Sequence, residues 1–330
     1  MKIGHITMSL LAGILCVCLS ACGGRSAYDK GELETKGIFR FEELLFDTPP
    51  EELAVALKNS GYRGTMINIA PEDPQYMQQV AGFVADTVIR YTYECVKEEY
   101  GDLGWLEESL TKALDKAHGL DDDVRITQVS TMITGQYDYD QRVVCADTEM
   151  VIGLDVYVMP QMRKYAYFNN PMYLVNLCKK EYILPDCMTA VARNLVRMPE
   201  SSKITLLDRM IMEGKATYMV DQCLGGVADT LKLRYTAQQL EWIEDNEAAV
   251  WAYMLKEKLL FEADANKYHN LVDEAPKTNA FGESSAPRCA QYIGWRIVES
   301  YMKNQKCSLK ELMENTDSQQ ILRESMYKPK

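Results

Sequence analysis

The N-terminus holds the residue with the clearest chemical signal. Leu19-Ser20-Ala21-Cys22 closes a short apolar run that begins at Met8, and Lys2 adds a positive charge before it. A run of this length is too short for a spanning helix and is typical of a signal peptide. Small residues leading into a cysteine form a lipobox. We therefore expect removal of residues 1–21 and acylation of the Cys22 thiol, which would anchor the chain in a membrane. A plain secretory signal cut nearby is the alternative.

Metal and nucleophilic chemistry find little support beyond this anchor. Only His118 and His269 remain after the signal, and no HExxH, HxH, paired-cysteine or GxSxG pattern occurs. Seven of the ten cysteines lie beyond Cys22, an odd number without the close pairs of metal or redox sites. We expect no metal, no cofactor and no catalytic residue. One disulfide among these cysteines remains an alternative, although their apolar neighbours in the sequence favour buried free thiols.

A second group of ionisable residues lies on two consecutive predicted helices, residues 185–197 and 204–223. Asp186, Arg193 and Arg197 share the polar face of the first, and Glu213 lies among apolar residues of the second. A carboxylate in such surroundings needs a partner or a raised pKa. Glu213 is thus either a ligand or general base in a cleft, or a structural ion pair with an arginine of the preceding helix. We favour the ion pair.

The helix predicted over residues 287–303 forms a third motif, comprising Gly294, Trp295, Arg296 and Glu299. Large apolar residues surround almost the whole helix, which predicts burial in the core rather than a docking face. A glycine inside a helix costs about 1 kcal/mol relative to alanine, so Gly294 predicts close approach by another element. Arg296 and Glu299 stand three residues apart and are expected to pair.

The elements that would position these residues indicate an α+β fold, mostly helical with a small, largely antiparallel sheet. We expect a tether over residues 22–37 and a single domain over residues 38–330. The predicted strands are residues 38–46, 126–133, 141–146 and 150–158. The other predicted helices are residues 51–59, 75–100, 105–117, 236–260 and 308–314. A net charge of -12 disfavours nucleic-acid binding.

Several motifs together give the chain a family resemblance. They are the lipobox at Cys22, Val151–Tyr157, Lys180–Asp186, Met212–Ala216, Tyr235–Trp251, Ser285–Arg288, Tyr292–Val298 and Tyr327–Pro329. As a set they resemble the GldB-type gliding-motility lipoproteins. The resemblance implies a periplasm-facing lipoprotein of the cell envelope, at the outer membrane. It would be no enzyme, and would support gliding-motility or type 9 secretion machinery through contacts with an envelope protein complex.

The family is also similar in layout to zinc peptidases, which use an HExxH helix followed by a glutamate-bearing helix. Here the first position reads Ala192-Arg193-Asn194-Leu195-Val196, without either histidine, and Glu213-Gly214 resembles the third-ligand position. The resemblance therefore implies a zincin-like scaffold without its metal site. Two alternatives stay open. One is a residual hydrolase that uses Glu213 with Asp186 or Asp155, and the other is a peptide-binding module in the degenerate cleft around Glu213.

Overall fold

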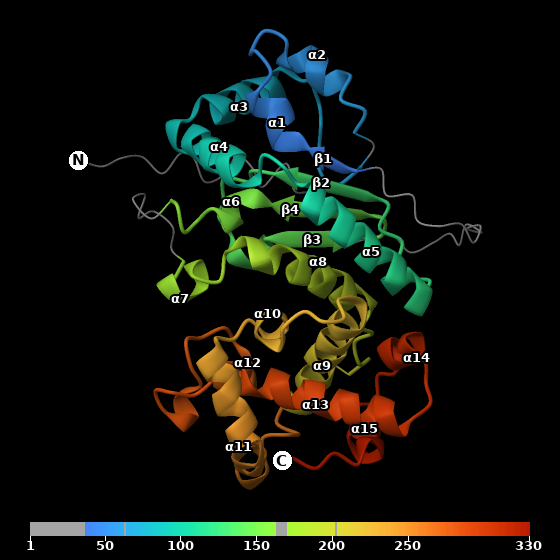
Figure 1. Ribbon diagram of the computed structural model, residues 1–330. Helices are drawn as coiled ribbons and strands as arrows, with labels where there is room; N and C mark the ends of the chain where they lie inside the picture. The colour runs from blue at the N-terminus through green and yellow to red at the C-terminus, as the bar shows by residue number, and fades with distance from the viewer. Residues whose placement is uncertain (1–36, 63, 163–169, 202) are drawn as a thin grey trace. The chain divides into compact units, whose positions relative to one another are not determined.

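The computed structural model describes residues 37–62, 64–162, 170–201 and 203–330 (Figure 1). The chain divides into two compact units. Unit 1 comprises the residues up to Asp115 together with Arg125–Lys180, and unit 2 comprises Lys116–Val124 and Glu181–Lys330. The predicted signal peptide, Cys22 and nearly all of the tether lie outside the described residues. No helix of the described ranges has the length and apolar character needed to span a membrane.

A four-stranded mixed sheet forms the centre of unit 1, in the order β1-β2-β4-β3 (Figure 1). The strands are β1 (Ile38–Arg40), β2 (Gln128–Met132), β3 (Val143–Ala146) and β4 (Glu149–Gly153). The α+β prediction is confirmed. The expectation of a largely antiparallel sheet is wrong, because β1–β2 and β2–β4 are parallel and only β3–β4 is antiparallel. Helices connect β1 to β2, as a parallel crossover requires.

Two predicted strands end early and continue as helices. After β1 the chain forms α1 (Phe41–Phe46), and after β4 it forms α6 (Leu154–Tyr157). Phe41 and Leu45 are both buried in α1 and stand four residues apart, which is helical spacing. Short apolar runs do not distinguish a strand from a buried helix, which explains the error.

The other helices of unit 1 follow the predicted pattern with one interruption. The long segment predicted over residues 75–100 is two helices, α3 (Pro74–Ala85) and α4 (Thr87–Tyr100). Asp86 separates them because its carboxylate accepts hydrogen bonds from the amides of Val88 and Ile89 at 2.8 and 3.0 Å, which caps α4. The remaining helices are α2 (Leu53–Lys58), α5 (Gly104–Leu120, which continues into unit 2) and α7 (Met172–Val175).

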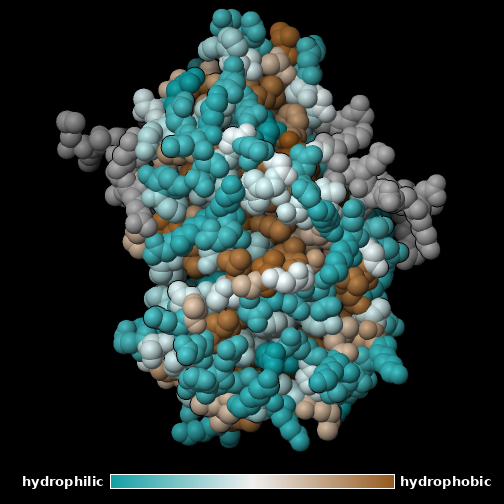
Figure 2. Space-filling model, in the orientation of Figure 1, coloured by the Kyte–Doolittle hydropathy of each residue, from teal (hydrophilic) through white to brown (hydrophobic). Residues whose placement is uncertain are grey.

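Unit 2 is helical, and hydrophilic residues predominate on the face of it drawn in Figure 2. Its longer helices are α8 (Lys180–Leu195), α9 (Leu206–Cys223), α11 (Ala237–Lys256) and α13 (Cys289–Asn304). The shorter ones are α10 (Asp229–Leu233), α12 (His269–Val272), α14 (Leu309–Glu314) and α15 (Ser318–Ser325). Thr236 and Gln239 form the predicted capping box of α11.

Helices α9 and α13 cross at two glycines in the core of unit 2. A Cβ atom placed on Gly294 would lie 1.9 Å from the carbonyl oxygen of Met210, and one on Gly214 would lie 2.4 Å from the carbonyl of Gly294. The close approach predicted for Gly294 is confirmed. Trp295 is buried, Arg296 pairs with Glu299, and most of α13 is buried, as expected for a core helix. The described cysteines beyond Cys22 are all free thiols.

Candidate functional site

Two buried arginines organise the polar interior of unit 2, and the first is Arg234. Its guanidinium lies 2.6 Å from the Asp186 carboxylate, and both side chains are 5% exposed. The guanidinium carbon also lies 4.5 Å from the centre of the Tyr182 ring. Charges removed from water need such partners, since an unpaired buried charge is strongly destabilising. Asp186 of α8 is therefore bound to the end of α10.

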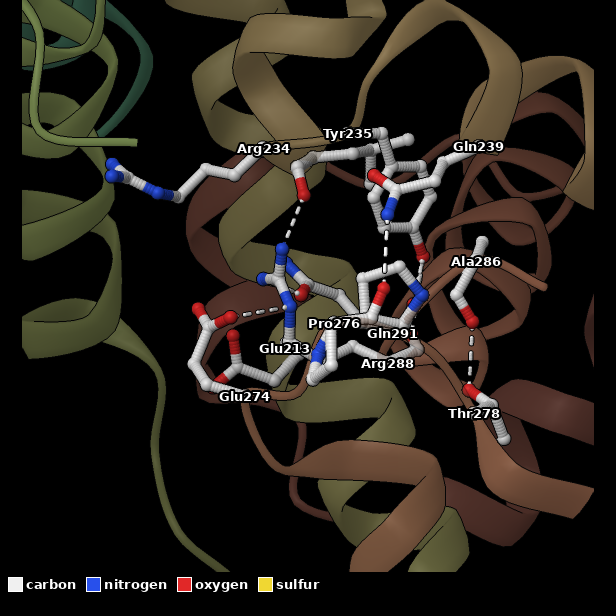
Figure 3. Close-up of polar contacts among 12 residues, drawn as sticks. Glu213, Arg234, Tyr235, Gln239, Glu274, Pro276, Thr278, Ala286, Arg288 and Gln291 are labelled. Carbon is white, nitrogen blue, oxygen red and sulfur yellow. Dashed lines mark hydrogen bonds and ion pairs between the residues drawn. The ribbon is translucent and has the colours of Figure 1, made fainter. Parts of the chain in front are cut away.

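The second is Arg288, which begins α13 and joins that helix to two other segments (Figure 3). It donates to the Leu233 carbonyl at 2.5 Å and to the Gln291 side chain at 2.7 Å. It also forms an ion pair with Glu274, with Nε 3.2 Å from the carboxylate. Arg288 thus links the end of α10, the start of α13 and the segment before η3 (Asn279–Phe281).

Tyr235 completes this network. Its hydroxyl donates to the Pro287 carbonyl at 2.7 Å. Burial raises the pKa of Tyr235 well above its ordinary value, so the hydroxyl stays protonated and remains a donor. Gln239 donates to the Pro276 carbonyl at 3.1 Å, and Thr278 to the Ala286 carbonyl at 2.8 Å (Figure 3). These contacts satisfy backbone carbonyls in the loops between helices, which is a structural role.

Both arginines have left-handed backbone conformations, with φ of 55° at Arg234 and 46° at Arg288. Such a conformation costs a non-glycine residue about 1 kcal/mol, so the side-chain contacts must hold it in place. Nothing in the sequence indicates that Arg234, Arg288 and Glu274 form a group. Arg288 stood in a family motif, but neither its burial nor its positive φ has a signal in the sequence.

The predicted cleft residues lie in different environments. Arg193 Nη2 is 2.8 Å from Glu213 Oε2, which is the ion pair with the preceding helix that we favoured. The pair is on the surface, with Arg193 52% and Glu213 36% exposed, so the expectation that Glu213 is surrounded by apolar residues is wrong. Arg197 is exposed beyond the end of α8, and Asp186 is buried against Arg234. Of these four described residues, Arg193 and Glu213 form an ion pair with each other.

Asp155, the other carboxylate considered for hydrolysis, belongs to unit 1. It is fully buried and accepts hydrogen bonds from the amides of Thr134, Gly135 and Tyr137 at 3.1–3.3 Å and from the Thr134 hydroxyl at 2.6 Å. Burial raises its pKa, and the hydrogen bonds oppose that shift. The arrangement anchors the loop after β2 rather than exposing a base.

Neither histidine lies beside these carboxylates. His118 Nδ1 is 2.8 Å from the Val124 carbonyl near the end of α5, and His269 Nδ1 is 2.9 Å from the Asn266 carbonyl on the surface. Three aspartates, Asp121–Asp123, place their oxygens within 4.8 Å of one another. The Lys310 amine lies among them, 3.1 Å from Asp123 and 3.9 Å from Asp121. One cation of the same unit, Lys310, therefore offsets part of the negative charge of this cluster.

Lys215 is a buried cation on α9, next to the helix crossing. Its side chain is 1% exposed, and its amine donates to the carbonyl of Asn315, the C-cap residue of α14. Burial lowers the pKa of Lys215 to about 8. The amine thus provides a hydrogen bond to a carbonyl at the C-terminal end of α14, but its charge is removed from water.

This shift predicts a pH dependence of stability. The pKa of Lys215 is about 8 in the folded chain against 10.5 for an ordinary lysine, so between these values only the unfolded chain holds the proton. The free energy of unfolding should therefore gain up to about 3 kcal/mol from Lys215 as the pH rises through that window. Chemical denaturation at pH 7.5 to 10.5 should show this rise relative to Lys215→Met. Lys303→Met, at an exposed position, is the control, and a pH-independent difference for Lys215→Met would contradict the prediction.

The family follows from a comparison of the whole chain. A family model described as "Gliding motility protein GldB" matches residues 29–329. The chain belongs to the GldB family. Membership makes it a gliding-motility-associated lipoprotein of the cell envelope. The match covers the arginine network and both helices of the Gly214–Gly294 crossing. Neither a curated protein nor a solved structure matches this GldB-family chain, so its likeness to zinc peptidases stays a prediction.

Proposed function

We propose that this GldB-family chain is a non-enzymatic lipoprotein, anchored through Cys22 and facing the periplasm from the outer membrane. It supports the assembly or stability of gliding-motility or type 9 secretion machinery through contacts with an envelope protein complex. Family membership supports the motility association. Family membership does not say whether the chain is an enzyme. Support for a non-enzymatic role comes from the contacts of the described carboxylates.

The proposal is supported by one observation: each carboxylate that we considered for hydrolysis already has an ion-pair or hydrogen-bond partner. Asp186 is bound by Arg234, Glu213 by Arg193, and Asp155 by four donors. A general base needs a free lone pair directed at the proton it removes, and a pKa near the working pH. An arginine partner instead occupies the carboxylate oxygens that a base would need. These contacts suit a stable scaffold better than an acid–base pair.

A peptide-cleavage assay tests this directly. The purified chain is incubated with zinc and a peptide library, alongside Glu213→Gln. We expect no cleavage by either protein, because Glu213 serves in a surface ion pair. Cleavage by the unmodified chain that is lost in Glu213→Gln would establish the hydrolase instead. Thermal stabilisation by extended peptides without cleavage would favour the peptide-binding module.

Crosslinking in intact cells tests for the proposed protein partner. The proteins that become attached to the chain are then identified. Cys22→Ser is the matched variant, since it removes the acylated thiol and leaves the described residues unchanged. We expect an envelope protein to be crosslinked to the unmodified chain and its yield to fall in Cys22→Ser. Recovery of no protein from either strain would contradict a role through protein contacts.

A further inference from the structure

Helix α11 has a solvent face that is apolar at its centre. Its buried side chains are Ile243, Glu247, Val250 and Met254. The opposite face is exposed at helical spacing and consists of Glu241, Glu244, Asp245, Ala248, Ala249, Ala252, Leu255 and Lys256. Leu255 is 50% exposed. Figure 1 shows α11 as an outer helix of unit 2. A helix face directed to solvent ordinarily carries charged and polar residues along its whole length.

The charges on this face are separated along the helix. Glu241, Glu244 and Asp245 lie in the first half, and among the described residues they have no ion-pair partner. Like charges three and four residues apart destabilise a helix by a few tenths of a kcal/mol. Lys256 lies at the other end, and α11 stops at this residue. Lys256 is 82% exposed, and its amine is 4.0 Å from the Glu257 carboxylate, a loose contact. The face therefore carries three carboxylates in its first half and one lysine, Lys256, at its far end.

We propose that this face binds the same face of a second copy of the chain, with the two α11 helices antiparallel. A two-fold axis near position 250 places Glu244 opposite Lys256 of the second copy, and Ala248 opposite Ala252. Glu244 of each copy then meets Lys256 of the other, which relieves part of the repulsion among the carboxylates of one helix. Such self-complementarity is what a two-fold interface requires. The alanines allow the two helix backbones to approach closely.

Aromatic residues border the face on both sides. Trp242 and Tyr253 pack against Phe281, with ring centres 5.9 and 5.0 Å apart. On the other side Tyr327 meets Trp251 edge-on at 5.5 Å. Tyrosine and tryptophan are enriched in protein interfaces because they supply large, rigid contact area. These half-buried rings therefore extend the proposed contact beyond the alanines.

The contact is expected to be weak in dilute solution. One helix face covers less than the roughly 800 Å² per partner that a stable complex buries. Two chains anchored in one membrane meet at a much higher effective concentration, which favours a weak contact. The dimer goes beyond the proposed function, and its test does not depend on whether the chain cleaves peptides.

Disulfide trapping tests the register in the full-length chain, reconstituted in vesicles of phosphatidylethanolamine and phosphatidylglycerol. We expect Ala248→Cys combined with Ala252→Cys to give a covalent dimer under mild oxidation, and either substitution alone to give several-fold less. The control is Glu108→Cys with Lys112→Cys, an exposed pair of the same spacing on α5. This control measures random collision in the membrane.

Charge exchange tests the ion pairs in the same assay. Lys256→Glu places like charges together at both symmetric positions, so the yield of trapped dimer should fall several-fold. Adding Glu244→Lys should restore it. A yield no higher than that of the α5 control, or no recovery in the exchanged variant, overturns the proposal. So does trapping of a different protein in place of the dimer in intact cells.

Discussion

Replacing Gly294 with alanine is expected to lower the free energy of unfolding by at least about 3 kcal/mol, although alanine is the better helix former. The added Cβ would lie 1.9 Å from the Met210 carbonyl oxygen, where ordinary contacts lie at 3.4–4 Å. The obstructing atom belongs to the backbone and cannot rotate away. Helices α9 and α13 must therefore separate, which opens the core around them.

Chemical denaturation followed by circular dichroism measures this effect. Gly214→Ala should act in the same direction, since its Cβ would meet the Gly294 carbonyl at 2.4 Å. The double variant should lose less than the sum, because one displacement of the helices relieves both clashes. Gly82→Ala in α3 is the matched control. Nothing lies within 4 Å of its Cβ, so it should stabilise by about 0.5–1 kcal/mol. Unchanged stability of Gly294→Ala would show that the two helices do not cross at these glycines.

The second large effect is expected at the buried ion pair. Asp186→Asn keeps the shape of the side chain but removes the negative charge that faces the Arg234 guanidinium, which is 5% exposed. Breaking a buried pair in this way costs about 3–5 kcal/mol. Arg234 also ends α10 with a φ of 55°, so its release removes the contact that holds a strained turn.

The contrast with the surface pair makes this prediction specific. Glu213→Gln removes the carboxylate that pairs with Arg193, but both side chains are more than a third exposed and water replaces this contact. Its cost should be less than about 1 kcal/mol. Asp186→Leu combined with Arg234→Met should recover much of the loss, since an apolar pair of similar volume needs no countercharge. Equal costs for Asp186→Asn and Glu213→Gln would contradict the difference in burial between the two pairs.

The sequence by itself determined most of the helices and one close packing contact. Periodicity and caps placed α9, α11 and α13, because an amphipathic stripe and a capping box are local features. The position of Gly294 inside a helix predicted the close contact with another helix, since an interior glycine lowers helix stability and is explained when another backbone approaches it. The lipobox and the spaced motifs were also local, and they led to the GldB family, whose model matches residues 29–329.

Only the tertiary structure decided the directions of the strands and the partners of the charges. The order β1-β2-β4-β3 depends on crossovers through distant helices, which periodicity does not record. Asp186 looked like part of a cleft because its helix has a polar face, but its partner, Arg234, lies 48 residues further along the chain. Burial and a positive φ are properties of the folded backbone. For that reason no local pattern distinguishes Arg234 and Arg288 from surface arginines, although they organise the polar interior of unit 2.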